Sequence, residues 1–216
     1  MEDTEYLFKV LVVGDIGAGK TSFIKRYVHN IYSVHYKSTI GVDFALKVLK
    51  WRDEKRDVDV NVRLQLWDIA GQERFGNMTR VYYKEAVAAI IMFDVTRMST
   101  FDAVQKWKAD IDSKVMLADG NPIPVILLAN KRDLILEEDD DSKEYWEKLK
   151  NDIDNFSQRH HFLAWFETSA KDGLNVELAV NNLVASIMEN VPIKVDSTDS
   201  SIIDLNESEP DNTCVC

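Results

Sequence analysis

The 216-residue sequence predicts an α/β domain built on a mostly parallel six-stranded sheet, with one antiparallel edge strand and helices on both faces. Three observations support this fold class. Apolar strand-like runs alternate with helical segments, and a glycine-rich stretch (GDIGAGKT, residues 14–21) directly follows the first apolar run. Residues 42–67 also contain two alternating runs separated by a charged turn. Folds of this class bind ligands at the carboxyl ends of their strands, so functional residues are expected in the loops that follow the strands.

The first half of the chain predicts a buried strand, a helix and a hairpin. Residues 7–13 are almost all apolar, as expected of a strand buried on both faces, and residues 21–28 have helical spacing. Residues 29–40 are polar and aromatic without periodicity, which indicates a loop. Residues 42–51 and 60–67 alternate apolar and polar side chains, so together with the intervening charged turn they predict an antiparallel hairpin.

The second half of the chain alternates strands and helices. Short apolar runs predict buried strands, and apolar residues at three- and four-residue spacing predict amphipathic helices. The helix at residues 143–160 is expected to bury Tyr145, Leu149, Ile153 and Phe156. The remaining expected strands are residues 88–93, 124–129 and 165–168, and the remaining expected helices are residues 81–86, 101–117 and 176–189.

The composition divides the chain into a domain, residues 1–191, and an acidic tail, residues 192–216, which is expected to be disordered. The net charge of −11 is concentrated in this tail and in an acidic run at residues 137–141. This run is most simply a solvated surface, and a partner site is the alternative. The remaining body is nearly neutral, which argues against a nucleic-acid-binding protein. No apolar run approaches the ~20 residues of a membrane span. The N-terminus lacks a signal peptide, and both cysteines lie at the extreme C-terminus, so a cytosolic protein is expected.

Residues 14–21 fit G-x-x-x-x-G-K-[ST], the loop that wraps nucleotide phosphates. Glycines let the backbone turn tightly, so that several N–H groups point at phosphate oxygens. Lys20 adds a charge for the β- and γ-phosphates, and the Thr21 hydroxyl can ligate Mg²⁺. The helix that begins here directs its positive end at the same anion. The buried strand before the loop and the helix after it strengthen this interpretation.

A second loop, Asp68 to Gln72 (DIAGQ), begins where strand 60–67 ends. A carboxylate at Asp68 can hold Mg²⁺ through water, and the Gly71 N–H can meet a γ-phosphate oxygen. Gln72 then lies where its amide can orient a water molecule for in-line attack. Alone, Asp68 would be interpreted as a turn carboxylate at a strand end. Its combination with the glycine loop favours the metal interpretation.

Two further motifs concern the nucleotide base. Asn130 to Asp133 (NKRD) follows strand 124–129 and matches N-K-x-D. The Asp133 carboxylate can accept two hydrogen bonds from one edge of guanine, whereas adenine would place an acceptor opposite it. After the last strand, the Ala170 N–H can bind guanine O6, although Ser-Ala-Lys at residues 169–171 is a weak signal without the other motifs.

With five motifs in order, residues 6–191 resemble the Ras-like small GTPases and, within them, the Rab family; STIGVDF (residues 38–44) and WDIAGQERF (residues 67–75) are local matches. The resemblance implies a P-loop NTPase of the Ras-like G-domain type that binds GTP or GDP with Mg²⁺. It implies Gln72 as the catalytic residue and Thr21, Thr39 and Asp68 as the metal site. Tyr32 would lie against the guanine face. The residues that the resemblance places at the nucleotide are Ile16, Gly17, Ala18, Gly19, Lys20, Thr21, Ser22, Tyr32, Thr39, Gly71, Asn130, Lys131, Asp133, Ser169, Ala170 and Lys171.

The same resemblance implies partners and a role in vesicle traffic. Phe44, Trp67 and Tyr82 match the aromatic trio through which Rab proteins present their nucleotide state to effectors, although plain core packing is an equal alternative for aromatics at strand positions. The other implied partners are a guanine nucleotide exchange factor, a GTPase-activating protein and a GDP dissociation inhibitor.

The tail ends in Cys214-Val215-Cys216, which matches the Cys-x-Cys ending on which Rab proteins carry two geranylgeranyl groups. One lipid gives only reversible membrane binding, and the acidic tail offers no polybasic second signal, so a second lipid is needed for stable anchoring. The expected location is the cytosol and the cytoplasmic face of intracellular membranes. Metal chelation or a disulfide is the alternative role of these cysteines.

Ile69 stands where most Rab proteins have threonine, a feature similar to the branch that serves lysosome-related organelles. It points to late endosomal, lysosomal or phagosomal membranes. Two other functions compete with a GTP switch. Asp133 argues against a P-loop ATPase or small-molecule kinase, and the presence of Gln72, Thr39 and Asp68 argues against a non-catalytic scaffold locked on nucleotide.

We predict that GTP hydrolysis is slow without an activating protein. Ile16 occupies a position where Ras has glycine, close to where Gln72 must act, and no arginine lies between Tyr32 and Thr39 to supply a guanidinium. Single-turnover cleavage of GTP by the purified chain should take minutes or longer. Faster cleavage in the absence of an activator would contradict the prediction.

Overall fold

The apolar run at residues 7–13 forms the centre of the sheet. It belongs to strand β1 (Glu5–Gly14), in which the four residues from Val10 to Val13 are almost completely buried. The computed structural model of the chain describes residues 5–35, 38–55, 57–72, 79–135 and 138–190. The predicted tail, residues 192–216, with Cys214 and Cys216, lies outside the described residues, as does Glu137.

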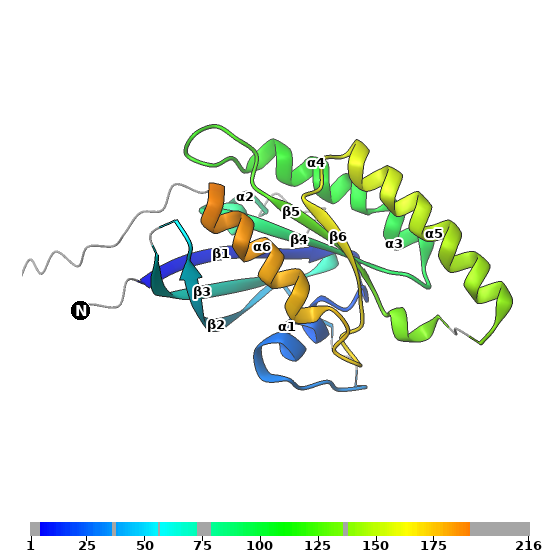
Figure 1. Cartoon of the computed structure of the whole chain (residues 1–216). Helices are drawn as coiled ribbons and strands as arrows, with labels where there is room; N and C mark the ends of the chain where they lie inside the picture. Colours follow the sequence, from blue (N-terminus) through cyan, green and yellow to red (C-terminus); the bar gives the residue numbers. More distant parts are fainter. Residues whose placement is uncertain (1–4, 36–37, 56, 73–78, 136–137, 191–216) are drawn as a thin grey trace, which may run out of the picture.

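Six strands form one sheet in the order β2-β3-β1-β4-β5-β6 (Figure 1). The edge strand β2 pairs antiparallel with β3, and every other pairing is parallel. This arrangement confirms the predicted α/β sheet with one antiparallel edge strand. The strands that follow β1 are β2 (Val42–Asp53), β3 (Val58–Ile69), β4 (Ala86–Asp94), β5 (Val125–Asn130) and β6 (Ala164–Thr168).

Helices cover both faces of the sheet (Figure 1). On one face, α1 (Lys20–His29) and α6 (Val176–Asn190) pack against the strands. On the other face lie α3 (Met98–Asp102), α4 (Val104–Lys114) and α5 (Asp140–Arg159), together with Tyr83 of the short helix α2 (Thr79–Tyr83). A 3₁₀ turn, η2 (Arg132–Leu134), follows β5.

Strand β4 shows how the sheet separates two apolar cores. Its side chains alternate, so that Ala88, Ile90 and Met92 enter the core beneath α1 and α6, whereas Ala89, Ile91 and Phe93 enter the core beneath α3 to α5. All six are fully buried, which explains why this strand is apolar without a polar alternation.

Two predicted helices end three residues earlier in the structure than the sequence predicts. The helix expected at residues 101–117 is two helices, α3 and α4, and it ends at Lys114. Val115 is extended (φ −129°, ψ 127°), and Met116 pairs with Pro122 in an antiparallel bridge, so the chain leaves the helix before Leu117. The helix expected at residues 81–86 ends at Tyr83, because Glu85 has a positive φ of 64° and Ala86 already pairs with Lys9 of β1.

Residues 138–141 of the acidic run are exposed, and α5 begins within them at Asp140. The Asp139 side chain accepts hydrogen bonds from the Ser142 N–H (2.9 Å) and hydroxyl (2.6 Å), which caps the helix. Asp140 and Asp141 occupy the first turn, where negative charge is favoured by the helix dipole. Along this helix Trp146, and not Tyr145, takes the buried position. The buried face of the helix is therefore shifted by one residue, which leaves Tyr145 exposed.

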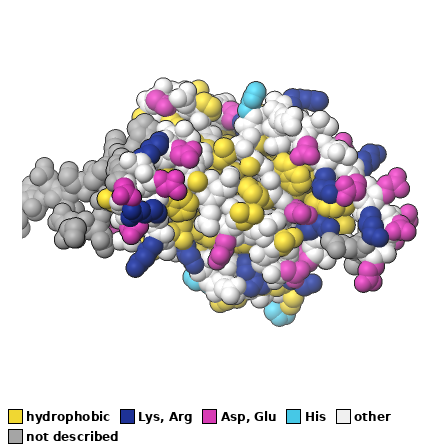
Figure 2. Space-filling model, viewed as in Figure 1, with side chains coloured by type: hydrophobic (Ala, Val, Ile, Leu, Met, Phe, Trp, Pro, Cys, Tyr) yellow, Lys and Arg dark blue, Asp and Glu magenta, His cyan; other side chains and the backbone are white. Residues whose placement is uncertain are grey.

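None of the described helices is long and apolar enough to cross a membrane. On the face shown in Figure 2, lysine and arginine side chains are interspersed with acidic ones. This mixture fits the nearly neutral body that the sequence predicts.

Candidate functional site

A cavity of about 600 Å³ lies at the carboxyl ends of the parallel strands, lined by the glycine loop and the start of α1, the loop before β2, the loop after β3, and Lys131. This volume lies within the ordinary range for small-molecule sites. The predicted site residues that line it are Ile16, Gly17, Gly19, Lys20, Thr21, Ser22, Tyr32, Thr39, Gly71, Gln72 and Lys131. Sequence reasoning missed other lining residues, which carry no motif: Lys25, Ile31, Ser33, Val34, His35, Ser38 and Ala70.

The glycine loop connects β1 to α1 and leaves the start of α1 free of a side-chain cap. Gly19 occupies the N-cap position with φ 98°, and a Cβ there would lie 2.3 Å from Asn130 Nδ2. Only glycine therefore fits the backbone and the contact. Because glycine has no capping oxygen, the first-turn N–H groups of α1 are available to an anion.

Lys20 is the buried cation of this loop. Its ammonium donates hydrogen bonds to the carbonyls of Gly14 (2.8 Å) and Asp15 (3.2 Å), and the side chain is almost completely buried. Burial lowers the pKa of Lys20 to about 8, and the charges of Asp68 and Asp15 only partly oppose this effect. An ammonium has three donors, so one remains for a ligand beyond the two carbonyls.

Two hydroxyls and one carboxylate meet at the start of α1. The Thr21 and Thr39 hydroxyl oxygens are 2.8 Å apart, and Asp68 Oδ2 accepts from Thr21 (2.5 Å) and Thr39 (3.3 Å). Burial raises the pKa of Asp68, while the hydrogen bonds from the two threonines and the charge of Lys20 act in the opposite direction. Its other oxygen, Oδ1, is buried and has no hydrogen-bond partner among the described residues. We call Thr21, Thr39 and Asp68 the hydroxyl–carboxylate cluster.

The cluster fits a Mg²⁺ ion. Magnesium takes oxygen ligands and commonly uses only one or two carboxylates, with water and substrate phosphates completing its shell. The unpartnered Asp68 oxygen is the kind of buried acceptor that such a cation, or its bound water, satisfies. Among the described residues no group of three or more His, Cys, Asp or Glu forms an all-protein metal site. The donor set therefore suits a cation shared with a phosphate ligand.

The loop after β3 approaches the glycine loop closely. A Cβ at Gly71 would lie 2.5 Å from the backbone nitrogen of Ile16, so position 71 requires glycine. Gln72 is exposed and lines the cavity, as does the Ile16 side chain, which is 50% exposed. These placements bring Ile16, Gly71 and Gln72 together, as the sequence predicts. Glu73 to Phe75 lie outside the described residues.

Asn130 joins three loops at the other end of the site. Its amide nitrogen donates to the Ala18 carbonyl (2.9 Å), and its amide oxygen accepts from the Thr168 hydroxyl and the Ala170 N–H (both 3.3 Å). Asn130 is 1% exposed and does not line the cavity. Its position is therefore that of a clamp between loops. The other predicted nucleotide and metal residues that do not line this cavity are Ala18, Asp68, Asp133, Ser169, Ala170 and Lys171.

The Asp133 carboxylate is held by the loop that follows β6. Asp133 Oδ1 accepts a hydrogen bond from the Ser169 hydroxyl (2.7 Å), and Lys171 Nζ lies 3.7 Å from Oδ2. Sequence reasoning missed Arg26 of α1, which donates to the carbonyls of Ala170 (2.8 Å) and Lys171 (2.5 Å). The N-K-x-D and Ser-Ala-Lys motifs therefore meet, braced by an arginine that no motif marks.

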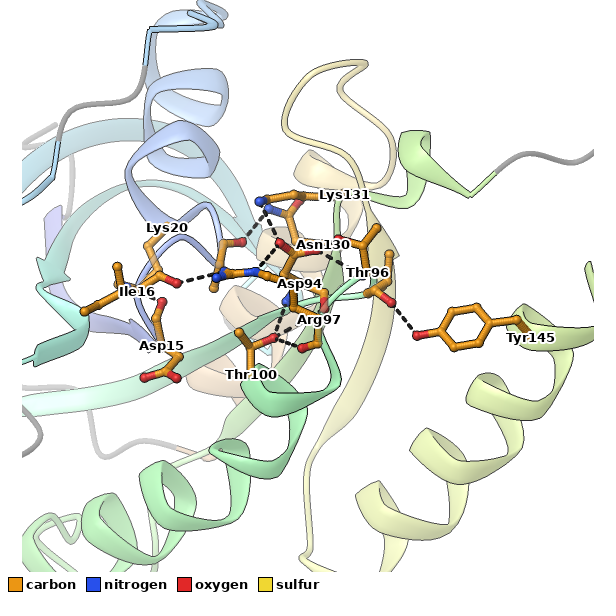
Figure 3. Close-up of polar contacts among 12 residues, drawn as sticks. Asp15, Ile16, Lys20, Asp94, Thr96, Arg97, Thr100, Asn130, Lys131 and Tyr145 are labelled. Carbon is orange, nitrogen blue, oxygen red and sulfur yellow. Dashed lines mark hydrogen bonds and ion pairs between the residues drawn. The ribbon is translucent and has the colours of Figure 1, made fainter. Parts of the chain in front are cut away.

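A second missed group is Asp94 at the end of β4, shown in Figure 3. Its Oδ2 atom accepts from Lys131 (2.7 Å) and Arg97 (2.9 Å), and Arg97 also donates to the Ile16 carbonyl (2.8 Å). Burial opposes ionisation of Asp94, but the hydrogen bonds from Lys131, Thr96 and Arg97 outweigh it and lower the pKa of this carboxyl.

Two residues of the aromatic trio lie next to the hydroxyl–carboxylate cluster, because Phe44 pairs with Trp67 and Trp67 precedes Asp68. Phe44 of β2 stacks on Trp67 of β3, with ring centroids 6.2 Å apart, and Phe44 is 68% exposed. Trp67 and Tyr82 are half-buried against the core beneath α3 to α5. Phe44 is therefore not a core residue. Ile69, by contrast, is fully buried in that core.

Comparison with known proteins agrees with this geometry. Residues 9–189 match the model of the Ras family. The chain is 64% identical to Ras-related protein Rab-32A of Dictyostelium discoideum over 187 residues, which cover 86% of this chain and 80% of the relative. The chain belongs to the Rab proteins of the Ras family.

Two human Rab proteins are also similar. Rab-32 is 53% identical over 218 residues (100% of this chain and 91% of the relative), and Rab-7L1 is 50% identical over 190 residues (88% and 87%). These matches confirm the predicted branch, that of lysosome-related organelles. Members of the family hydrolyse GTP to GDP, so this Rab protein is a GTPase, and it acts as a switch in membrane traffic.

We predict that Asn130→Ala lowers the free energy of unfolding by about 2–4 kcal/mol, because it leaves the buried Ala18 carbonyl and Ala170 N–H without their partner. Urea denaturation in excess GDP measures the change. Asn151→Ala, at an exposed position of α5, is the matched control and should change stability by less than about 0.5 kcal/mol. Equal stability of the two variants would contradict the clamp.

Proposed function

We propose that this Rab protein binds GTP or GDP together with Mg²⁺ in the 600 Å³ cavity, hydrolyses GTP slowly, and presents its GTP state to effectors. The observation that carries the proposal is the hydroxyl–carboxylate cluster, in which Thr39 of the loop before β2 reaches Thr21 and Asp68. Mg²⁺ bound there would neutralise charge on the β- and γ-phosphates.

Each group at the phosphate end has a chemical role in this proposal. The Lys20 ammonium and the first-turn N–H groups of α1 bind the phosphates, and the Gly71 N–H contacts the γ-phosphate. Gln72 orients the attacking water from the rim of the cavity. The branched side chain of Ile16 shares that rim and crowds the space in which the water and Gln72 align, which accounts for slow hydrolysis without an activating protein.

At the other end of the site, Asp133 selects guanine. Its carboxylate accepts from the two N–H groups on one edge of the base, while the Ala170 N–H meets O6. The hydrogen bond from Ser169 and the nearby Lys171 ammonium hold the carboxylate in orientation. Tyr32, which lines the cavity, lies against the guanine face.

The cluster also links the nucleotide to the effector surface. Thr39 and Phe44 flank the start of β2, and Phe44 stacks on Trp67, the residue before Asp68. Mg²⁺ and the γ-phosphate together would hold the loops that contain Thr39 and Gly71, and hydrolysis would release both loops, an order–disorder switch of the kind known in GTPases. The exposed Phe44 ring then loses the geometry that a partner recognises, together with Trp67 and Tyr82.

The remaining parts of the proposal concern partners and membrane. An exchange factor, an activating protein, a GDP dissociation inhibitor and effectors would act on this protein as on other Rab proteins, at endolysosomal membranes. Two prenyl groups on Cys214 and Cys216, which lie outside the described residues, would provide the anchor.

Base selectivity tests the proposed nucleotide site. The purified chain should bind mant-GDP at least about 100-fold more tightly than mant-ADP, since a buried mismatch of donors and acceptors is costly. Asp133→Asn should lose most of this preference, whereas Asp152→Asn on the exposed face of α5 should keep it. Equal affinities for both nucleotides in the unmodified chain would favour an ATPase or small-molecule kinase.

Intact-mass measurement of the chain isolated from eukaryotic cells tests the anchor. We expect a mass increase that corresponds to two prenyl groups, and its loss in the Cys214→Ser, Cys216→Ser double variant, because stable anchoring without a polybasic segment requires both lipids. An unmodified C-terminus would remove the membrane anchor from the proposal.

A further inference from the structure

We propose that Arg97 is a positioning residue that holds the phosphate loop around bound nucleotide and thereby slows nucleotide release. The proposal rests on the nucleotide site described above and adds to it a residue outside every motif. Arg97 lies between β4 and α3, and its guanidinium contacts the loop between β1 and α1 (Figure 3). Arg97 does not line the cavity.

The guanidinium makes two directed hydrogen bonds and one close packing contact. Arg97 Nη2 donates to the Ile16 carbonyl at 2.8 Å, and Nε donates to Asp94 Oδ2 at 2.9 Å. A Cβ at Gly17 would lie 2.9 Å from Nη2, so the guanidinium lies directly against the backbone of the loop. The arginine therefore uses different nitrogens of its planar fork for the loop and for its counter-ion.

The planarity of the peptide bond transmits this contact into the cavity. In a trans peptide the carbonyl of Ile16 and the N–H of Gly17 point in opposite directions. Because Arg97 holds the carbonyl on the outside, it aims the Gly17 N–H toward the cavity that Gly17 lines. A charge-assisted hydrogen bond to the carbonyl also polarises the amide, which strengthens its N–H as a donor to phosphate.

Asp94 extends the contact to the base end of the site. The same Oδ2 atom that accepts from Arg97 accepts from Lys131 of the N-K-x-D motif at 2.7 Å. Its Oδ1 atom accepts from the N–H (3.0 Å) and hydroxyl (2.7 Å) of Thr96. The Asp94 side chain is 2% exposed, so this carboxylate is fixed. One buried anion thus joins the loops that follow β1, β4 and β5.

The backbone that carries Arg97 is itself held in place. Thr100 donates its hydroxyl to the Arg97 carbonyl at 2.7 Å, and the Val95 N–H bonds the Asn130 carbonyl at 3.1 Å. From α5, the Tyr145 hydroxyl donates to the Val95 carbonyl at 2.6 Å (Figure 3). Contacts from α3, β5 and α5 therefore hold the backbone that positions the guanidinium.

The test compares nucleotide release from matched variants at fixed Mg²⁺. Displacement of mant-GDP by excess GDP should be roughly tenfold faster in Arg97→Met, and release of a non-hydrolysable GTP analogue should accelerate similarly. The rate of mant-GDP release from Arg97→Lys should lie between the rates of the unmodified chain and of Arg97→Met, because a single ammonium does not reproduce the planar fork of the guanidinium. Arg52→Met is the control, since Arg52 is comparably exposed and ion-paired but lies at the tip of the β2–β3 hairpin.

Two readouts separate positioning from general loss of stability. The phosphorus resonances of bound GDP should shift in Arg97→Met and not in Arg52→Met, because only the former reorients a phosphate-binding amide. Preference for mant-GDP over mant-ADP should be unchanged, because Asp133 is intact. If Arg97→Met does not fold, the rate of nucleotide release and the phosphorus resonances of bound GDP are measured in Arg97→Lys. A faster release and shifted resonances in that variant support the role of Arg97, and unchanged values contradict it.

The outcomes distinguish this proposal from the proposed function. Failure of the unmodified chain to retain guanine nucleotide would overturn both. Retention by the unmodified chain with release from the Arg97 variants at the same rate, or equal acceleration in Arg52→Met, would overturn the role of Arg97 alone.

Discussion

One side-chain amide, that of Asn130, joins the loops that follow β1 and β6. Its position at the end of β5 places it between the loops that follow β1 and β6, because the parallel strands end at the same edge of the sheet. The contacts require an amide. Its nitrogen donates to the Ala18 carbonyl and its oxygen accepts from the Ala170 N–H, whereas a carboxylate would present an acceptor to Ala18. Phosphate and base motifs from distant parts of the sequence thus acquire a fixed separation.

Burial disfavours the charged forms of Lys20 and Asp68, two groups of the phosphate end of the site. The pKa of Lys20 is lowered and that of Asp68 is raised, which means that the surroundings oppose the charged form of each. One oxygen of Asp68 also has no partner among the described residues. A phosphate and a divalent cation are the ligands that would relieve both conditions. Binding free energy then adds to folding stability, so the protein is most stable as the nucleotide complex.

Much of the fold and site could be predicted because the signals are local. The glycine loop, Asp68 to Gln72 and Asn130 to Asp133 are motifs in which residue type and spacing carry the chemistry. The contacts of Arg26 and Arg97 could not be predicted in this way, because a long side chain bonds backbone carbonyls that tertiary packing brings near. Packing also decided that Trp146 and not Tyr145 is buried, since a shift of one residue rotates the buried face of a helix by about 100°.

Ile16 takes part in both proposed roles through different groups. Its side chain shares the cavity rim with Gln72, whereas its carbonyl points to Arg97 on the outer side of the loop. A change in the side chain therefore alters the space around the attacking water without removing the contact to Arg97. A change at Arg97 frees the carbonyl without altering that space. If Ile16 slows hydrolysis and Arg97 slows nucleotide release, as we propose, opposite sides of one residue would influence the two rates, and each rate could be adjusted without the other.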